Sequence, residues 1–189
     1  ADIAAINTAA LGGLSETNVA TLSSDQAAAL TTAQVATLKT TQIHALTSTQ
    51  VGALSTSQVG TLSAAQVGAL TTDNVAGLST TQIGALSTKS VTGLSTAQVG
   101  ALSSTQVEAL SSTQTAALTS SQIGALSTAD IAVFSTDDIA AITTTALAGL
   151  STTDIGSLSS GQLQAITTTQ LQAMNTDQVA AVIAAYHAA

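Results

Sequence analysis

The sequence contains no cysteine and no proline, and its 189 residues include one phenylalanine, one tyrosine and no tryptophan. The absence of cysteine excludes a disulfide framework and any cysteine-ligated metal site. Charged residues make up only 6% of the chain, and two basic against ten acidic residues give a formal net charge of -8. Because a nucleic-acid partner requires a basic face that neutralises phosphates, this balance excludes nucleic-acid binding.

Long apolar runs are also absent, although hydrophobic residues make up 45% of the chain. A membrane-spanning helix needs about 20 mostly apolar residues in a row. The longest apolar run covers residues 179–185 and is followed by Tyr186. No basic segment followed by an apolar core opens the sequence, so neither a membrane span nor a signal peptide is predicted.

An apolar residue instead recurs at every eighth position from Ile6 to Val182, and we name these residues the anchor column. A second apolar column follows five residues after each anchor, and only Ala27 and Thr115 weaken it. The consensus octad reads Leu-Ser/Thr-Thr-x-Gln-Val/Ile-Gly/Ala-Ala. No linker interrupts the repeats, so the pattern predicts one octapeptide-repeat domain over residues 1–189.

Neither a continuous helix nor a strand accommodates this period. A helix advances about 100° per residue, so an eight-residue column would spiral around it. In a strand, the two columns would lie on opposite faces. A helix N-terminus in every octad satisfies both columns, because Ser55 is a suitable N-cap, Gln58 completes a capping box, and Leu54 and Val59 form a hydrophobic staple. The sequence therefore predicts an all-α solenoid of short capped helices, one per octapeptide, with a β-solenoid as the alternative.

Some octads depart from the consensus. Lys39 replaces the capping Ser or Thr, and Ser90 replaces the Gln of the capping box. Ile183 stands where the last octad would have its cap. We therefore expect Asn175 to cap a longer C-terminal helix, at about residues 176–187.

Groups that could carry catalysis are scarce. His44 and His187 are the only histidines, and they lie at opposite ends of the repeat array. The acidic group Asp130, Asp137 and Asp138 lacks the alternating acidic pattern and the distal Glu of a calcium loop. A carboxylate also suits the helix N-terminus, which explains Asp130 and Asp138, as it does Asp154 in a later octad. We expect no catalytic residue, no metal ligand and no cofactor, and we do not expect an enzyme.

The third position of the octad carries a regular series of threonines. They are Thr56, Thr72, Thr80, Thr88, Thr96, Thr128, Thr136, Thr144 and Thr152. A regular array of hydroxyl and methyl groups could match a regular ligand such as ice or a glycan lattice. Capping and solvation of helix N-termini explain these small polar residues as well, and we favour that explanation because Ser and Thr are suitable N-caps.

Octads such as Leu-Ser-Thr-Ala-Gln-Val-Gly-Ala at 94–101 resemble the low-complexity arrays of very large bacterial surface proteins, such as secreted adhesins and fibre proteins. The resemblance covers nearly the whole chain and implies an extracellular structural or adhesive role. The chain departs from these proteins in lacking a calcium-binding nonapeptide and a surface-anchor motif.

Both ends of the repeat array are apolar, whereas solenoids usually protect their ends with polar capping repeats. We expect the apolar residues at these ends to mediate head-to-tail self-association, which does not close and so propagates into a filament. They are Ile3, Ile6, Leu11, Leu14, Val179, Val182, Ile183 and Tyr186.

These features together favour an extracellular structural protein, either a self-assembling fibre subunit or an adhesin stalk, whose partner is a second copy of itself. Ice binding through a threonine face is the alternative, and a scaffold that binds peptides along a groove is a weaker one. The sequence does not identify a surface or glycan ligand.

Overall fold

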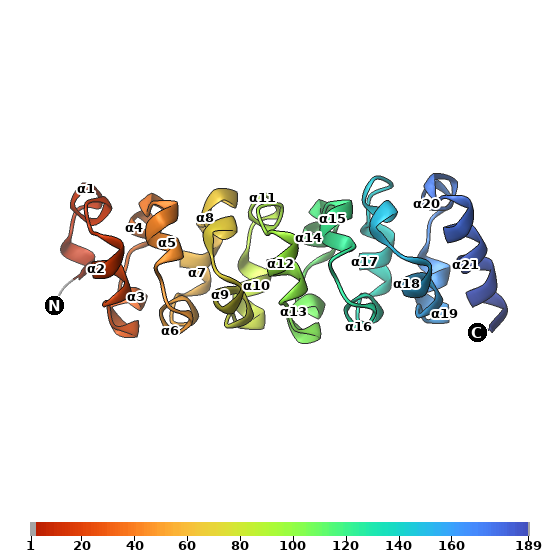
Figure 1. Cartoon of the computed structure of the whole chain (residues 1–189), viewed down its shortest axis with the longest axis horizontal. Coiled ribbons are helices and arrows are strands. Elements are labelled where there is room, and N and C mark those ends of the chain that lie inside the picture. Colours follow the sequence, from red (N-terminus) through yellow and green to blue (C-terminus); the bar gives the residue numbers. More distant parts are fainter. Residues whose placement is uncertain (1–2, 189) are drawn as a thin grey trace. The chain divides into compact units, whose positions relative to one another are not determined.

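The computed structural model describes residues 3–188, and nearly every octad in this range forms one short helix (Figure 1). Among these residues there is no strand, so the predicted all-α solenoid is confirmed and the β-solenoid alternative is wrong. The chain divides into two compact units, Ala1–Leu94 and Ser95–Ala189.

The first unit contains η1 (Ile3–Ala5), α1 (Thr8–Gly12), α2 (Glu16–Ala20), α3 (Ser24–Ala28), α4 (Thr32–Thr37), α5 (Thr40–His44), α6 (Ser48–Gly52), α7 (Thr56–Gly60), α8 (Ala64–Ala69), α9 (Thr72–Ala76), α10 (Thr80–Ala85) and α11 (Thr88–Val91). The second unit contains α12 (Thr96–Gly100), α13 (Ser104–Glu108), α14 (Ser112–Ala117), α15 (Ser120–Ile123), α16 (Thr128–Ala132), α17 (Thr136–Ala141), η2 (Ala146–Gly149), α18 (Thr152–Gly156), α19 (Ser160–Ala165), α20 (Thr168–Ala173) and α21 (Thr176–Ala188).

Each α-helix begins where the octad places its cap, and α10 illustrates the geometry. The Ser79 hydroxyl accepts a hydrogen bond from the Gln82 backbone N–H at 3.2 Å, and the Ser79 backbone N–H donates to Gln82 Oε1 at 2.8 Å. This reciprocal pair is the capping box predicted from the sequence. The helix ends because Leu86, the next anchor, is already extended at φ -59° and ψ 135° and leads into the next cap.

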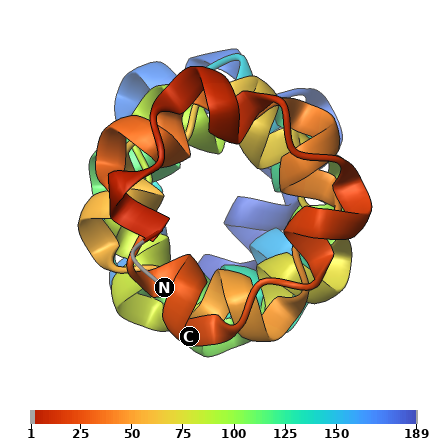
Figure 2. The same cartoon turned by 90° about the vertical axis from the view of Figure 1, so that its left-hand side faces the viewer.

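Within each unit, successive turns of the solenoid stack because a helix packs on the third helix after it. In the first unit α7 contacts α10 and α8 contacts α11, and in the second unit α14 contacts α17 and α15 contacts η2. Three octads of eight residues therefore make one turn of 24 residues. Viewed end-on, the helices of the first unit follow one another around a ring (Figure 2).

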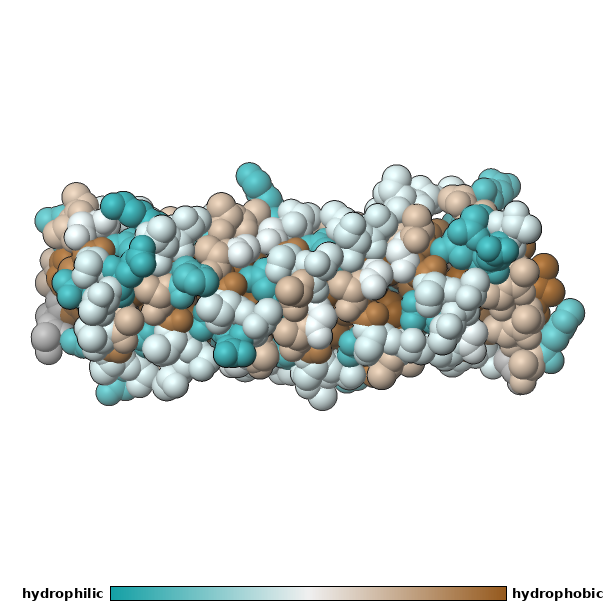
Figure 3. All heavy atoms as spheres, in the orientation of Figure 1, coloured by the Kyte–Doolittle hydropathy of each residue, from teal (hydrophilic) through white to brown (hydrophobic). Residues whose placement is uncertain are grey.

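The two apolar columns fill the interior of each unit. Val51, Val59 and Ile83 are fully buried, and most anchor leucines are nearly so. Burying one such side chain contributes about 1.5–3 kcal/mol, so stability depends on the stacking of neighbouring turns. Small residues of intermediate hydropathy cover most of the face shown in Figure 3, and the hydrophilic side chains on it are scattered.

The departures from the consensus have local consequences. Lys39 makes no side-chain capping bond to α5, although its backbone N–H still donates to Gln42 Oε1 at 2.9 Å. Ala146 occupies the position of the capping-box Gln, and its octad forms the 3₁₀ helix η2 in place of an α-helix. At the C-terminus, Asn175 Oδ1 accepts from the Gln178 backbone N–H at 2.9 Å and so caps the long helix α21.

Candidate functional site

The glutamine at the fifth octad position has a second role that links successive turns. Gln82 Nε2 donates to the carbonyl oxygens of Val51 at 3.2 Å and Leu54 at 2.7 Å, which lie one turn earlier, while its Oε1 caps its own helix. The side chain is 3% exposed. One buried amide therefore satisfies an N–H in one turn and two carbonyls in the turn before it.

We name the set of such residues the glutamine ladder. Among its members, this inter-turn bond is made by Gln34, Gln42, Gln50, Gln58, Gln66 and Gln82 in the first unit, and by Gln162, Gln170 and Gln178 in the second, and the set is not limited to these. The capping box predicted from the sequence accounts for the bond to Oε1 within the octad, but not for the bonds from Nε2 to the preceding turn. Leaving a buried polar group unpaired costs about 1–3 kcal/mol. Because each ladder amide pairs buried groups in two turns, its loss would destabilise both turns.

Several octads have a shorter residue at the ladder position, and Asn74, Ser90 and Ala146 show how the inter-turn bond changes with it. Asn74 Nδ2 still donates to the Leu46 carbonyl at 3.0 Å, and the Ser90 hydroxyl donates to the Leu62 carbonyl at 2.5 Å. Ala146 has no group that could donate. The shorter the side chain, the less space it holds open between turns.

A glycine at the eighth octad position accompanies each of these shorter residues. A Cβ on Gly93 would lie 2.1 Å from the Ala64 carbonyl oxygen of the preceding turn, and a Cβ on Gly149 would lie 2.1 Å from that of Ser120. At Gly77, which follows Asn74, a Cβ would meet the Ser48 Cβ at 3.4 Å. The preceding turn therefore leaves no room for a side chain at Gly93 and Gly149, whereas a Cβ on Gly77 would make an ordinary contact with it.

Aspartate replaces the ladder glutamine in three octads of the second unit. Asp130 and Asp154 are 5% and 7% exposed, and one oxygen of each accepts from the capping serine of its own helix. The other oxygen accepts from a hydroxyl of the preceding turn, at 2.8 Å from Ser104 Oγ and from Thr128 Oγ1 respectively. Asp138 keeps the capping bonds to Ser135, but no residue among 3–188 donates to its second oxygen.

The residues predicted to mediate self-association differ in exposure. Ile6, Ile183 and Tyr186 are 37%, 53% and 52% exposed and are the exposed large apolar side chains of residues 3–188. Leu14 and Val179 are half-buried. Ile3, Leu11 and Val182 are buried, so they belong to the interior of their units.

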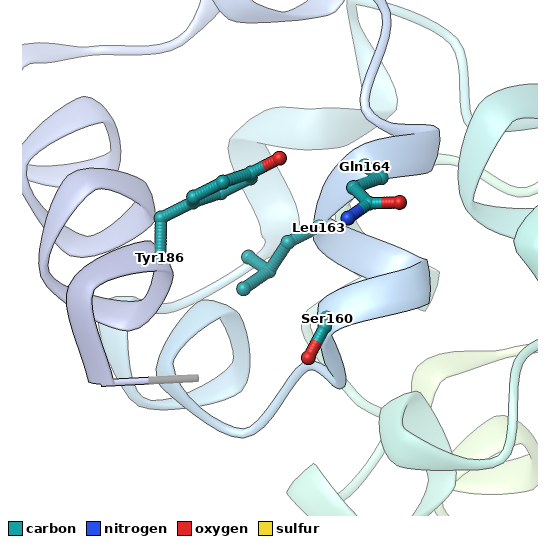
Figure 4. Close-up of a pocket in the computed structure, with 4 residues that line it drawn as sticks. All are labelled: Ser160, Leu163, Gln164 and Tyr186. Carbon is teal, nitrogen blue, oxygen red and sulfur yellow. The ribbon is translucent and has the colours of Figure 1, made fainter.

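Tyr186 extends from α21 toward α19. It lines a pocket of about 230 Å³ together with Ser160, Leu163 and Gln164 (Figure 4). The α21 helix packs on α18 and α19, and hydrophobic side chains gather at this end of the second unit (Figure 3).

The two histidines, which are the remaining chemical candidates, belong to different units. His44 is exposed, with Nδ1 3.0 Å from the Ala69 carbonyl oxygen, and His187 is exposed on α21. Within residues 3–188, no three histidine or acidic side chains gather in a way that could hold a metal ion. No helix in the same part of the chain combines the length and apolarity that a membrane crossing requires.

The three-octad turn changes which threonines share a face. Thr80 and Thr88 begin consecutive helices, α10 and α11, which pack on different partners, α7 and α8. Threonines aligned from turn to turn are 24 residues apart. In the first unit, Thr8, Thr32, Thr56 and Thr80 are exposed at the starts of α1, α4, α7 and α10, and these helices contact one another in that order.

Comparison with protein families identifies the repeat. The family model described as ALTTAQ repeat matches residues 1–32, 28–64, 52–80, 76–112, 91–128, 116–152, 131–168 and 147–182. No curated protein and no solved structure matches the chain.

Proposed function

Since the chain belongs to the ALTTAQ repeat family and its turns are joined by buried side-chain amides, we propose that it is an extracellular structural protein, a self-assembling fibre subunit or adhesin stalk. The observation that carries the proposal is the distribution of exposed apolar side chains. Those of residues 3–188 are confined to Ile6, near the first helix, and to Ile183 and Tyr186 on α21. Ile183 and Tyr186 are three residues apart on α21 and so share one face of that helix. Neighbouring exposed apolar side chains of this kind mark surfaces that associate.

Some donors and acceptors of the glutamine ladder find no ladder partner among residues 3–188. The Gln26 amide caps its own helix through Oε1, and its Nε2 donates to no residue among 3–188. The carbonyl oxygens of Ile166 and Met174 receive no glutamine amide from the same residues. A second copy that continues the ladder would pair these donors and acceptors and cover the apolar residues. Such a contact is heterologous and propagates.

Sedimentation velocity over a concentration series tests self-association. The double variant I183K/Y186K places two charges on the exposed face of α21, and we expect it to stay monomeric with unchanged helical circular dichroism. The matched control T56K/T80K adds the same charges to exposed sites on α7 and α10 and should associate like the unchanged chain. Val182 is left alone because it is buried. Association of I183K/Y186K at wild-type strength would contradict the proposal.

The extracellular location rests on the resemblance of the octads to those of bacterial surface proteins. Proteolysis of intact source cells should remove the protein. If the protein is protected until the cells are lysed, the location is wrong.

Ice binding is the second candidate, and the aligned row of Thr8, Thr32, Thr56 and Thr80 favours it. The variant T32K/T56K should then abolish thermal hysteresis. The control T40K/T88K replaces two exposed threonines of another row and should retain it. Equal hysteresis in both variants would rule out this row.

A further inference from the structure

A pocket of about 500 Å³ in the second unit lies where the start of α17 stacks on the start of α14. Its lining includes Glu108, Leu110, Ser112, Val133, Asp137 and Asp138. This combination of carboxylates with two apolar side chains distinguishes it from the small neutral surface of most repeats.

The pocket lies where other octads place the glutamine amide. In α19, Gln162 Nε2 donates at 2.7 Å to the carbonyl of Phe134, 28 residues earlier. Asp138 has the corresponding position in α17, and the residue 28 positions earlier is Leu110, which lines the pocket. Aspartate is one methylene shorter and has no N–H to donate. The site therefore presents acceptors where the rest of the ladder presents a donor.

One carboxylate oxygen of this site is unpartnered. Asp138 is 6% exposed, and its Oδ2 accepts from the Ser135 N–H at 2.9 Å and the Ser135 hydroxyl at 2.6 Å. Its Oδ1 receives no hydrogen bond from any residue among 3–188. The equivalent oxygens of Asp130 and Asp154 accept from hydroxyl groups of the preceding turn. Ser112 is the counterpart of those hydroxyl residues, and it lines the pocket without bonding to Asp138.

Charge and shape then define the ligand. Glu108 and Asp137 add two exposed carboxylates, and residues 95–189 contain no lysine or arginine that could neutralise them. The pocket therefore favours a cation that donates N–H groups. Because no three ligating side chains of residues 3–188 gather on one point, a metal ion fits poorly. Leu110 and Val133 suit the alkyl stem of a basic side chain.

From this arrangement we propose that the Asp138 pocket binds a lysine or arginine side chain of a partner polypeptide. The ligand's charged group donates to Asp138 Oδ1 and the Leu110 carbonyl, as the ladder amide does in other octads. Charge-assisted hydrogen bonds of this kind are stronger than neutral ones. The proposal is independent of self-association.

Titration of the whole chain with the peptide acetyl-Gly-Arg-Gly-amide, followed by NMR at low ionic strength, tests this site, since salt screens exposed charges. We expect saturable shifts centred on residues 108–112 and 133–138. The variant D138Q restores the ladder amide and fills the pocket, so it should fold at least as stably and bind at least about tenfold more weakly. The control D130Q makes the same change one octad earlier and should bind like the unchanged chain.

Two further ligands complete the test. The same peptide with citrulline in place of arginine is neutral and nearly isosteric, and it should not bind. Calcium chloride alone should not shift the pocket residues. Binding of the citrulline peptide, full binding by D138Q, or shifts caused by calcium and not by the arginine peptide would each overturn the proposal.

Discussion

Replacing Gln82 by alanine separates the two roles of a ladder glutamine. The variant Q82A removes the bond from the Ser79 N–H to Oε1 at 2.8 Å, and the bonds from Nε2 to the carbonyls of Val51 at 3.2 Å and Leu54 at 2.7 Å. A net 0.5–1.5 kcal/mol per bond gives a loss of about 1.5–4.5 kcal/mol in the free energy of unfolding.

Gln26 provides the matched control. It forms the same capping box, with the Ser23 N–H donating to Oε1 at 2.8 Å, but its Nε2 donates to no residue among 3–188. The variant Q26A therefore loses one bond and should cost about 0.5–1.5 kcal/mol. The difference between Q82A and Q26A, about 1–3 kcal/mol, is the contribution of the link between turns.

Urea unfolding followed by circular dichroism gives the free energies, and amide hydrogen exchange locates the effect. In Q82A, amide protons of both α10 and α7 should lose protection from exchange. The Gln82 amide caps α10 and also binds the carbonyl of Leu54, which directly precedes the residue that caps α7. In Q26A the loss should be confined to α3. If Q82A costs no more than Q26A, the glutamine acts only as a helix cap and the reasoning about the ladder is refuted.

Two further predictions concern the packing between turns. Thr115 is fully buried and its hydroxyl has no partner among residues 3–188, so T115V should stabilise the chain by about 1–2 kcal/mol; a lower urea midpoint would contradict this. The variant G149A should cost more than about 2 kcal/mol, because its Cβ would lie 2.1 Å from the Ser120 carbonyl oxygen. The same change should cost at least about 1 kcal/mol less when Ala146 is first replaced by glutamine, which holds the turns apart; additive costs in the double-mutant cycle would contradict that spacing role.

Local structure was predictable because it follows from neighbours in sequence. Ser55 and Gln58 cap α7 through the predicted capping box, with Gln58 accepting from the Ser55 N–H at 2.6 Å. Asn175 likewise starts a helix longer than the others, Thr176–Ala188, where about 176–187 was predicted. Caps and staples involve residues within five positions of one another, so one octad contains all the information that they need.

The number of octads per turn could not be predicted, because it depends on the angle between consecutive helices. The inter-turn role of the glutamine was missed for the same reason, since its partners are 28 and 31 residues away. One signal for close contact between turns was nevertheless present. Asn74, Ser90 and Ala146 at the fifth octad position are each followed by a glycine at the eighth, namely Gly77, Gly93 and Gly149.

The candidate site was predicted only in part. Asp138 was recognised as a helix-capping carboxylate, and this role is confirmed. The unpartnered Oδ1 of Asp138 was not predicted. A hydroxyl group 26 residues earlier donates to the corresponding oxygen of Asp130 and of Asp154, but the hydroxyl of Ser112 does not donate to Asp138. Such a difference between similar octads arises only once the turns are stacked.

A disulfide bond placed between turns tests the three-octad solenoid most directly, since the chain has no cysteine of its own. A Cβ on Gly77 would lie 3.4 Å from the Ser48 Cβ, close to the separation of about 3.8 Å typical of a disulfide. The variant S48C/G77C should therefore cross-link on mild oxidation, as shown by mass spectrometry of proteolytic fragments. The variant S48C/A85C, with its second cysteine one octad later, should stay reduced. Cross-linking of S48C/A85C in place of S48C/G77C would mean four octads per turn and would contradict the ladder.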